Sequence, residues 1–342
     1  MIPVGHRDTA GLPRVVVLRA LGLGDLLTGV PALRAVRAAF PRHELVLAVP
    51  AFLTPLVRLL DGTVDTVVDV DFRDRVGPLP QALHAPDVAV NLHGRGPESH
   101  AALLALDPGR LIAWHLPGVH AGPRWRDDEH ERARWCRLLR GSDIPADPAD
   151  HLLRPPSDCV PAEFAGATIV HPGASAPARR WPVERWAAVA RHELDRGNDV
   201  IITGDANEAE LAKAVASHAG VGGQWVVAGH TDVEELTALV CAAARVACGD
   251  TGVAHMAAAL ATPSVVVFGP TSPARWGPPQ NGRHTVLWAG QTADPHADKP
   301  DEGLLAITVA DVTHALDALP VPSVSAGRMD PPFRPFAQTL HL

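Results

Sequence analysis

The stretch CGDTGVAHMAAAL, residues 248–260, places an acid, a hydroxyl and a glycine immediately before a helical run. An Asp directly before a helix is a good N-cap, so Asp250 is predicted to cap a helix over 251–260. The backbone N–H groups of Thr251 and Gly252 then point out of the positive end of that helix. Such an arrangement binds anions, a phosphate group in particular.

The stretch HPGASAPARRWP, residues 171–182, is a second candidate for anion binding. It puts small residues and two arginines between a predicted strand and a helix that starts near Pro182. Arg179 and Arg180 can grip a diphosphate through forked, charge-assisted hydrogen bonds. An arginine pair on a solvated surface loop explains the same residues equally well, so both interpretations stay open.

The stretch GLGD, Gly22 to Asp25, also lies between a predicted strand and a predicted helix. The dinucleotide-binding pattern G-x-G-x-x-G/A continues from Gly22 and Gly24 but meets Leu27 at its last small position, which weakens a nicotinamide interpretation. Asp25 is either a plain helix N-cap or a carboxylate that acts in catalysis. Its position at the end of a strand favours function modestly.

Other reactive residues favour structural interpretations. His255 lies one helical turn from Thr251 on the same face, and a lone His among alanines is more often a satisfied core residue. Asp69 and Asp71 resemble a D-x-D metal clamp, but paired acids are common in an acidic chain, and no metal site is predicted. The cysteines form no C-x-x-C pair and are expected to be reduced thiols: Cys136, Cys159, Cys241 and Cys248.

These loops must be held by strands and helices, and the chain alternates between the two. Alternation of this kind predicts an α/β protein with mainly parallel sheets. The predicted strands are 15–19, 44–49, 64–70, 87–92, 110–114, 167–173, 199–205, 224–229, 244–250 and 263–270. The predicted helices are 26–40, 98–106, 182–196, 206–218, 232–243, 251–260 and 310–319. The charged segment 127–141 is predicted to be a helix with a solvated face.

The proline-rich segment 151–165 interrupts the alternation and predicts a linker between two domains, 1–150 and 166–320. Two such layers leave a cleft, and ligands of open α/β sheets bind beyond the carboxyl ends of the strands. The tail 321–342 is rich in proline with few apolar anchors and is expected to be disordered.

Composition limits the partners. The net charge of −8 argues against bulk electrostatic binding to nucleic acid. No segment is long and apolar enough to span a bilayer, and the N-terminus lacks a secretory signal pattern. A cytoplasmic protein is therefore expected; peripheral association with a membrane stays open, and the sequence does not indicate an oligomeric state.

Three ordered motifs together resemble glycosyltransferase family 9, the heptosyltransferases. They are LRALGLGDLLTGVPALRAVRAAFP, HPGASAPARRWPVERW and GDTGVAHMAAALATPSVVVFGPTSPARWGP, within a resemblance that runs from residue 14 to about 319. The resemblance implies a GT-B fold of two Rossmann-like domains facing a central cleft, the acceptor in the first and the nucleotide-sugar in the second. It also implies inversion at the anomeric carbon without a metal or cofactor.

The resemblance assigns roles to individual residues. Asp25 corresponds to the general base, Arg179 to a basic residue that is usually Lys, and Glu234 to an acid that contacts the donor ribose. The D-T-G-x-x-H loop falls on Asp250, Thr251, Gly252 and His255. Leu21 and Gly22 stand where lipopolysaccharide heptosyltransferases tend to have hydroxyl residues, so the sugar, nucleobase and acceptor stay undetermined.

The predicted activity is transfer of a sugar, heptose favoured, from a nucleoside diphosphate, ADP favoured, to a glycan, lipid-linked or small-molecule acceptor. A nicotinamide oxidoreductase would need the complete glycine pattern and an acid after 44–49. A noncatalytic nucleotide-sugar-binding protein would keep the 250–255 loop and make Asp25 dispensable. A sugar epimerase of GT-B fold would need no acceptor.

Overall fold

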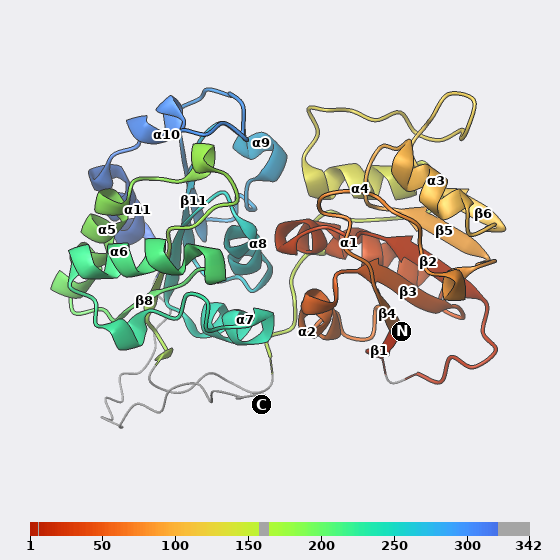
Figure 1. The fold of residues 1–342 in the computed structure, drawn as a ribbon, viewed down its shortest axis with the longest axis horizontal. Helices are drawn as coiled ribbons and strands as arrows, with labels where there is room; N and C mark the ends of the chain where they lie inside the picture. The colour runs from red at the N-terminus through yellow and green to blue at the C-terminus, as the bar shows by residue number, and fades with distance from the viewer. Residues whose placement is uncertain (6, 157–163, 321–342) are drawn as a thin grey trace. The chain divides into compact units, whose positions relative to one another are not determined.

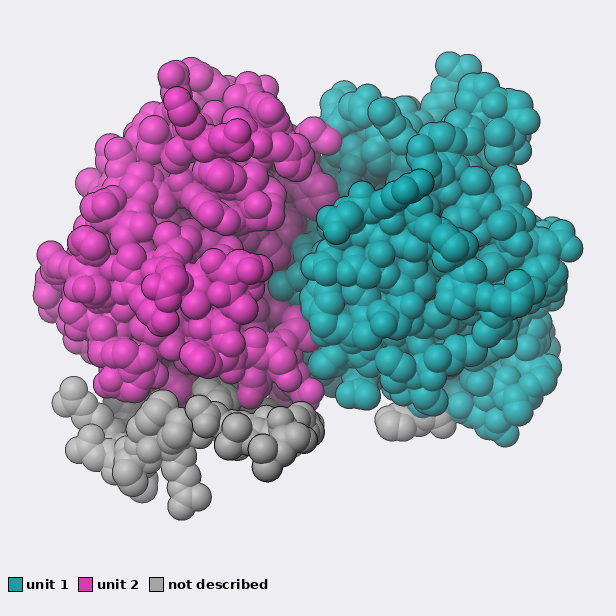
Figure 2. Space-filling view, viewed as in Figure 1, with its two compact units in different colours: residues 1–154 teal, residues 155–342 magenta. Residues whose placement is uncertain are grey.

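The computed structural model describes residues 1–5, 7–156 and 164–320. The chain divides into two compact units, Met1–Arg154 and Pro155–Leu342, coloured separately in Figure 2. The division falls inside the proline-rich segment 151–165. The predicted tail, 321–342, lies outside the described residues.

Unit 1 contains a six-stranded sheet in the order β1-β4-β3-β2-β5-β6 (Figure 1). Only β1 runs antiparallel to its neighbour, and the other pairs are parallel. Val15, Val16 and Val17 of β2 are completely buried, as expected of a central strand covered on both faces. The strands are β1 (Ile2–Pro3), β2 (Arg14–Leu18), β3 (Glu44–Val49), β4 (Thr66–Asp69), β5 (Val88–Asn91) and β6 (Arg110–Ile112). The helices are α1 (Leu23–Ala39), α2 (Thr54–Arg58), α3 (Glu98–Leu104) and α4 (Glu131–Arg140), with short 3-10 turns η1 (Ala51–Leu53) and η2 (Gln81–Leu83).

Unit 2 contains a five-stranded, wholly parallel sheet in the order β11-β10-β9-β7-β8. Trp181 and Trp186 pack edge to face in its core, with ring centroids 4.9 Å apart. The strands are β7 (Thr168–His171), β8 (Val200–Ile202), β9 (Arg245–Gly249), β10 (Ser264–Phe268) and β11 (His284–Trp288). The helices are α5 (Val183–Asp195), α6 (Ala209–Ala219), α7 (Val233–Ala242), α8 (Gly252–Ala259), α9 (Pro273–Trp276), α10 (Glu302–Ala306) and α11 (Val309–Ala318), with 3-10 turns η4 (Pro177–Arg179), η5 (Ala206–Glu208) and η6 (Gly223–Trp225).

The α/β class with mainly parallel sheets is confirmed, but one predicted strand does not form and one strand was not predicted. Residues 224–229 form no strand, because η6 ends at Trp225, a turn follows, and only a single bridge joins Val226 to Ile202. The strand β11 was not predicted, and its residues are only half-buried. Among the described residues, no helix is both long enough and apolar enough to cross a bilayer.

The helix predicted in 127–141 forms as α4 (Glu131–Arg140), but its charged residues do not form a solvated face. Trp135, Leu138 and Leu139 are fully buried, and so are the charged Glu131 and Arg134. The two charged side chains pair with each other, which satisfies them away from water. A charge-rich sequence pattern cannot distinguish this pairing from a solvated surface.

Each sheet has one point where the direction of winding reverses. In unit 1, β3 and β4 follow β2 outward on one side while β5 and β6 lie on the other, so the switch is between β2 and β5. In unit 2 the switch is between β7 and β9. Ligands of open α/β sheets bind outside the carboxyl ends of the strands at these points. Asp25 follows β2, and the segments 171–182 and 250–255 follow β7 and β9.

Candidate active site

Asp25 occupies the third position of α1, because the helix already begins at Leu23 after Gly22 as N-cap. The interpretation of Asp25 as a plain N-cap is therefore wrong. Its carboxylate instead folds back, and Oδ2 accepts the backbone N–H of Gly22 at 3.3 Å. Gly24 lies between them in the first turn. The Asp25 side chain is 30% exposed, so the carboxylate can reach a ligand outside the helix.

Arg19 lies beneath Asp25 and is completely buried. It donates to the backbone carbonyls of Asp25 and Leu92 and, at 2.9 Å, to Oγ1 of Thr28. Its Nη2 lies 3.9 Å from Oδ1 of Asp25 and 3.6 Å from Oε1 of Glu131. The residue joins the end of β2, the start of α1 and the end of β5. Sequence analysis missed it, although a charged residue directly after an apolar strand was the available signal.

The surroundings of Asp25 raise the pKa of its carboxyl group above the ordinary value. Burial is the largest cause, Arg19 opposes it, and the negative charge of Glu131 adds to it. A helix N-terminus by itself would favour the ionised form and lower its basicity. Here the pKa is raised nevertheless, with burial as the largest cause. Asp25 is consequently a better proton acceptor than a carboxylate in water.

A turn after β5 adds an uncharged histidine to this edge of the sheet. Oδ1 of Asn91 accepts the backbone N–H groups of His93 at 3.0 Å and Gly94 at 3.3 Å, which fixes the turn. Burial, with help from the charge of Arg19, lowers the pKa of His93 to about 4. His93 is therefore neutral near pH 7. It too was missed from the sequence, where only the strand was recognised.

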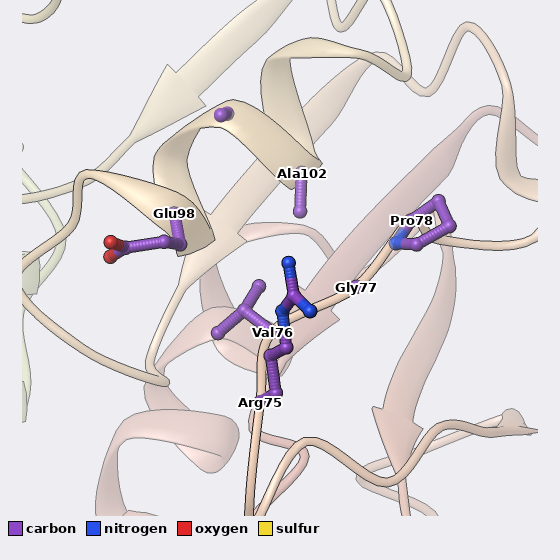
Figure 3. A pocket seen from close by; sticks show the side chains of 7 residues that line it. Arg75, Val76, Gly77, Pro78, Glu98 and Ala102 are labelled. Carbon is purple, nitrogen blue, oxygen red and sulfur yellow. The ribbon is translucent and has the colours of Figure 1, made fainter.

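A cavity of about 610 Å³ in unit 1 lies between α3 and the chain that follows β4 (Figure 3). Phe72 in that chain donates its backbone N–H to Ala20, and its ring packs edge to face on His93. These contacts connect the chain that borders the cavity to the Asp25 loop. Arg75 extends toward Ala102, whereas Glu98 points away (Figure 3). The lining residues are Arg75, Val76, Gly77, Pro78, Glu98, Ala101 and Ala102.

In unit 2, Arg179 approaches the end of β9. Its Nη1 lies 3.9 Å from Oδ2 of Asp250 and 3.5 Å from the backbone oxygen of the same residue, while Nη2 donates to Ser175. Nε of Arg179 and Oγ1 of Thr251 are buried without a hydrogen-bond partner in the described part of the chain. Both atoms therefore keep hydrogen-bonding capacity that the described residues do not use. Arg180 holds the loop itself, because its Nε donates to the Ala174 carbonyl at 2.8 Å.

Asp250 does not cap α8, contrary to the sequence prediction. Thr251 is the N-cap residue and α8 begins at Gly252. The Asp250 carboxylate is drawn to Arg179 instead, with which it forms a long ion pair. Burial raises the pKa of Asp250 to about 6, and Arg179 only partly opposes this rise. The open N–H groups at the start of α8 keep their positive potential.

The remaining predicted residues lie around this loop. His255 packs its ring edge to face on Trp276, with centroids 5.7 Å apart, and is half-buried. Glu234 is an exposed residue in the first turn of α7, whose N-cap is Asp232. The structure therefore brings Arg179, Asp250 and Thr251 together, while it records no contact of Glu234 with them.

A buried polar group that sequence analysis missed supports the loop after β7. His171 bonds to Oγ1 of Thr203 at 3.0 Å, and its Nε2 lies 3.8 Å from Oε2 of Glu208. A Cβ on Gly173 would lie 2.1 Å from the Glu208 carboxyl group. A larger residue at this point of HPG would therefore displace the Glu208 carboxyl group from its place beside His171.

Acidic groups elsewhere are committed to protein contacts. Asp69 accepts the backbone N–H of Ala51 at 2.8 Å, and Asp71 pairs with Arg73 at 2.6 Å. In unit 2, His192, Glu193 and Asp317 have the spacing of metal ligands. Oε2 of Glu193, however, lies 3.3 Å from Arg245 and accepts hydrogen bonds from Thr168 and Asn198, so its charge is already compensated.

Comparison with known proteins shows which family the chain resembles. Residues 157–304 match the sequence model of glycosyltransferase family 9 (heptosyltransferase). Over this segment the chain is similar to glycosyltransferase family 9. Lipopolysaccharide heptosyltransferase 2 of Salmonella typhimurium is 32% identical over 188 residues, which cover 54% of this chain and 48% of the relative. The matched segment thus spans about half the length of that relative.

Solved structures agree with the predicted GT-B fold. ADP-heptose LPS heptosyltransferase II of Escherichia coli has a TM-score of 0.71 and 20% identity, covering 89% of this chain and 98% of its own. The E. coli heptosyltransferase WaaC, solved with ADP, has a TM-score of 0.68 and 20% identity, covering 89% and 99%. At this identity the likeness establishes the fold alone, which is the GT-B fold of two Rossmann-like units with mainly parallel sheets.

Proposed function

We propose that this protein is an inverting glycosyltransferase that needs no metal. It transfers a sugar, heptose favoured, from a nucleoside diphosphate donor, ADP-heptose favoured, to a glycan, lipid-linked or small-molecule acceptor. The observation that carries the proposal is Asp25, a part-exposed carboxylate of raised pKa at the switch point of unit 1. Unit 1 is assigned the acceptor and unit 2 the nucleotide-sugar. The protein acts in the cytoplasm.

The chemistry follows from these groups. Asp25 accepts the proton of an acceptor hydroxyl while that oxygen forms a bond to the anomeric carbon of the donor. The bond from the anomeric carbon to the diphosphate oxygen breaks on the opposite face, which inverts the configuration. Arg179 and the first N–H groups of α8 stabilise the negative charge that the leaving diphosphate acquires.

The other predicted residues have supporting roles. Thr251 and Gly252 supply the start of α8, Arg180 holds the diphosphate loop, and Glu234 accepts hydrogen bonds from the donor ribose. His255 lies one turn further along α8, beside Trp276. Gly22 and Gly24 belong to the loop and the first helical turn that carry Asp25.

The adenine base is the favoured nucleobase because a solved heptosyltransferase of similar fold holds ADP. We expect ADP to raise the unfolding temperature of unit 2 more than UDP, GDP or NAD does. At a concentration one hundred times its Kd, a ligand stabilises the folded state by about 2.7 kcal/mol. A thermal-shift panel of the four compounds measures this, with Arg179→Ala as the variant that should lose the response. Stabilisation by NAD alone would contradict a transferase.

Transfer itself is tested with an ADP-sugar and candidate acceptors in buffer that contains EDTA. The expected result is release of ADP that depends on the acceptor. Release of ADP and free sugar without any acceptor would favour the epimerase alternative. Donor binding without any turnover would favour a noncatalytic binding protein.

Donor affinity is expected to rise as the pH falls toward about 6 and to level off below it, because Asp250 is charged above its pKa of about 6 and neutral below it. A bound diphosphate repels the charged form and so raises the pKa of Asp250 further. For each pH unit by which donor binding raises the pKa of Asp250, the affinity at low pH exceeds that at high pH by about tenfold. Calorimetry with ADP-glucose across roughly pH 5 to 8 measures the effect, because its diphosphate diester keeps a constant charge there.

The Asp250→Asn variant should bind ADP-glucose with an affinity that no longer depends on pH. Asp311→Asn is the matched control, since it removes an exposed carboxylate of α11 in the same unit. An unchanged pH dependence in folded Asp250→Asn would remove Asp250 from the diphosphate site.

A further inference from the structure

A group of alternating charges lies under the Asp25 carboxylate, and α4 supplies half of it. Arg19 stands between Asp25 on one side and Glu131 on the other, with its Nη2 at 3.9 Å and 3.6 Å from their oxygens. Glu131 also pairs with Arg134 and accepts the indole N–H of Trp135 at 2.8 Å. The group contains two positive and two negative side chains.

The hydrogen bonds of Arg19 prevent it from closing fully on Asp25. Its Nε and Nη1 donate to backbone carbonyls, and its Nη2 donates to Thr28. The guanidinium also lies over the Trp135 ring, 4.9 Å from the ring centroid, which fixes its plane. Arg19 therefore holds the backbone of Asp25 firmly and leaves the carboxylate outside hydrogen-bond distance.

Glu131 competes for the charge of Arg19. It is buried and lies closer to Nη2 than Asp25 does, so it offsets part of the positive field that would otherwise act on Asp25. We propose that Glu131 is a positioning residue, which engages Arg19 and so keeps the Asp25 carboxylate free to accept the acceptor proton. The inference rests on the proposed role of Asp25 as general base.

Charged and titratable groups from three elements surround Arg19 and Asp25. Arg19 follows β2, Glu131 and Arg134 lie on α4, and His93 follows β5. Burial and the charge of Arg19 lower the pKa of His93 to about 4, so its ring is uncharged near pH 7. Glu131 is thus the negative neighbour whose removal would leave the charge of Arg19 to act on Asp25 without competition.

The test is Glu131→Gln, which keeps an acceptor for Trp135 and removes the charge. The titration of Asp25 is followed by its ¹³C carboxyl signal, assigned by its disappearance in Asp25→Asn. We expect the Asp25 midpoint to move down by about one pH unit. The low-pH limb of kcat/KM should move with it. A merely structural role would reduce activity at every pH and leave both midpoints in place.

Glu129→Gln is the matched control, because Glu129 precedes the same helix but pairs with Arg137 at 2.7 Å. It should leave the Asp25 midpoint unchanged. If Glu131→Gln does not fold, Glu131→Asp replaces it, since the shorter side chain withdraws the charge from Arg19 and should also lower the midpoint. An unchanged Asp25 midpoint in either folded variant overturns the inference.

The titration separates this inference from the proposed function. Should the wild type transfer no sugar, the proposed function fails, yet the carboxyl signal still reports whether Glu131 acts on Asp25. If transfer occurs and depends on Asp25, but the Asp25 titration midpoint is the same in Glu131→Gln as in the wild type, the proposed function stands and the positioning role is refuted.

Discussion

Asp25→Asn is expected to lower the rate of sugar transfer by about 10²- to 10⁴-fold, the usual contribution of a positioned general base. Asparagine cannot take up the acceptor proton as a carboxylate does. Folding should be preserved, because the amide oxygen of Asn can still accept the Gly22 N–H and because Arg19 binds the backbone carbonyl rather than the side chain. Donor affinity should stay near that of the wild type.

The measurement is transfer rate, donor Kd and unfolding temperature on one preparation of the Asn variant. Asp71→Asn serves as the control, because it removes an exposed carboxylate of the same unit that pairs with Arg73. Near-normal turnover by folded Asp25→Asn would reduce Asp25 to a helix-stabilising residue and remove the base from the mechanism.

Arg19→Leu is expected to lower the free energy of unfolding by about 3–5 kcal/mol, as for other buried ion pairs that lose one partner. The side chain is completely buried, and its loss leaves two backbone carbonyls and Thr28 without their donor. Glu131 would keep its ion pair with Arg134 but lose the one with Arg19. The backbone carbonyl of Asp25 would lose the hydrogen bond that it accepts from Arg19.

Urea unfolding with the midpoint and slope recorded separately measures this loss. Arg73→Leu is the matched control, since Arg73 is 52% exposed and its ion pair with Asp71 should contribute about 1 kcal/mol or less. A loss below about 1 kcal/mol for Arg19→Leu would mean that leucine packing compensates for the buried charges.

Local patterns in the chain were sufficient for most of the architecture. The β-branched run at Val15–Val17 and the apolar residues of 264–268 predict buried parallel strands, because burial on both faces requires near-continuous apolar residues. The motifs around Asp25, Arg179 and Asp250 follow strands in the sequence as they do in the structure. Segment 224–229 failed because an apolar run alone does not distinguish a strand from a buried turn.

Helix boundaries were less predictable, and they change the chemistry. Asp25 and Asp250 each follow a strand closely, and both suit the N-cap position. In the structure, Gly22 and Thr251 are the caps, so one carboxylate folds back to Gly22 and the other turns to Arg179. A long-range partner decided the orientation of Asp250, since Arg179 comes from the loop after β7, whereas the partner of Asp25 is Gly22, three residues away.

By itself, then, the sequence determined the fold class, the family resemblance and the loops that carry the candidate chemistry, because these depend on periodicity and on short motifs. Only the tertiary structure decided the electrostatics of Asp25. Arg19 and Glu131 are far apart in the chain and meet because α4 packs on α1. Burial and the negative charge of Glu131 raise the pKa of Asp25 and Arg19 opposes them, whereas the helix start alone would have lowered it.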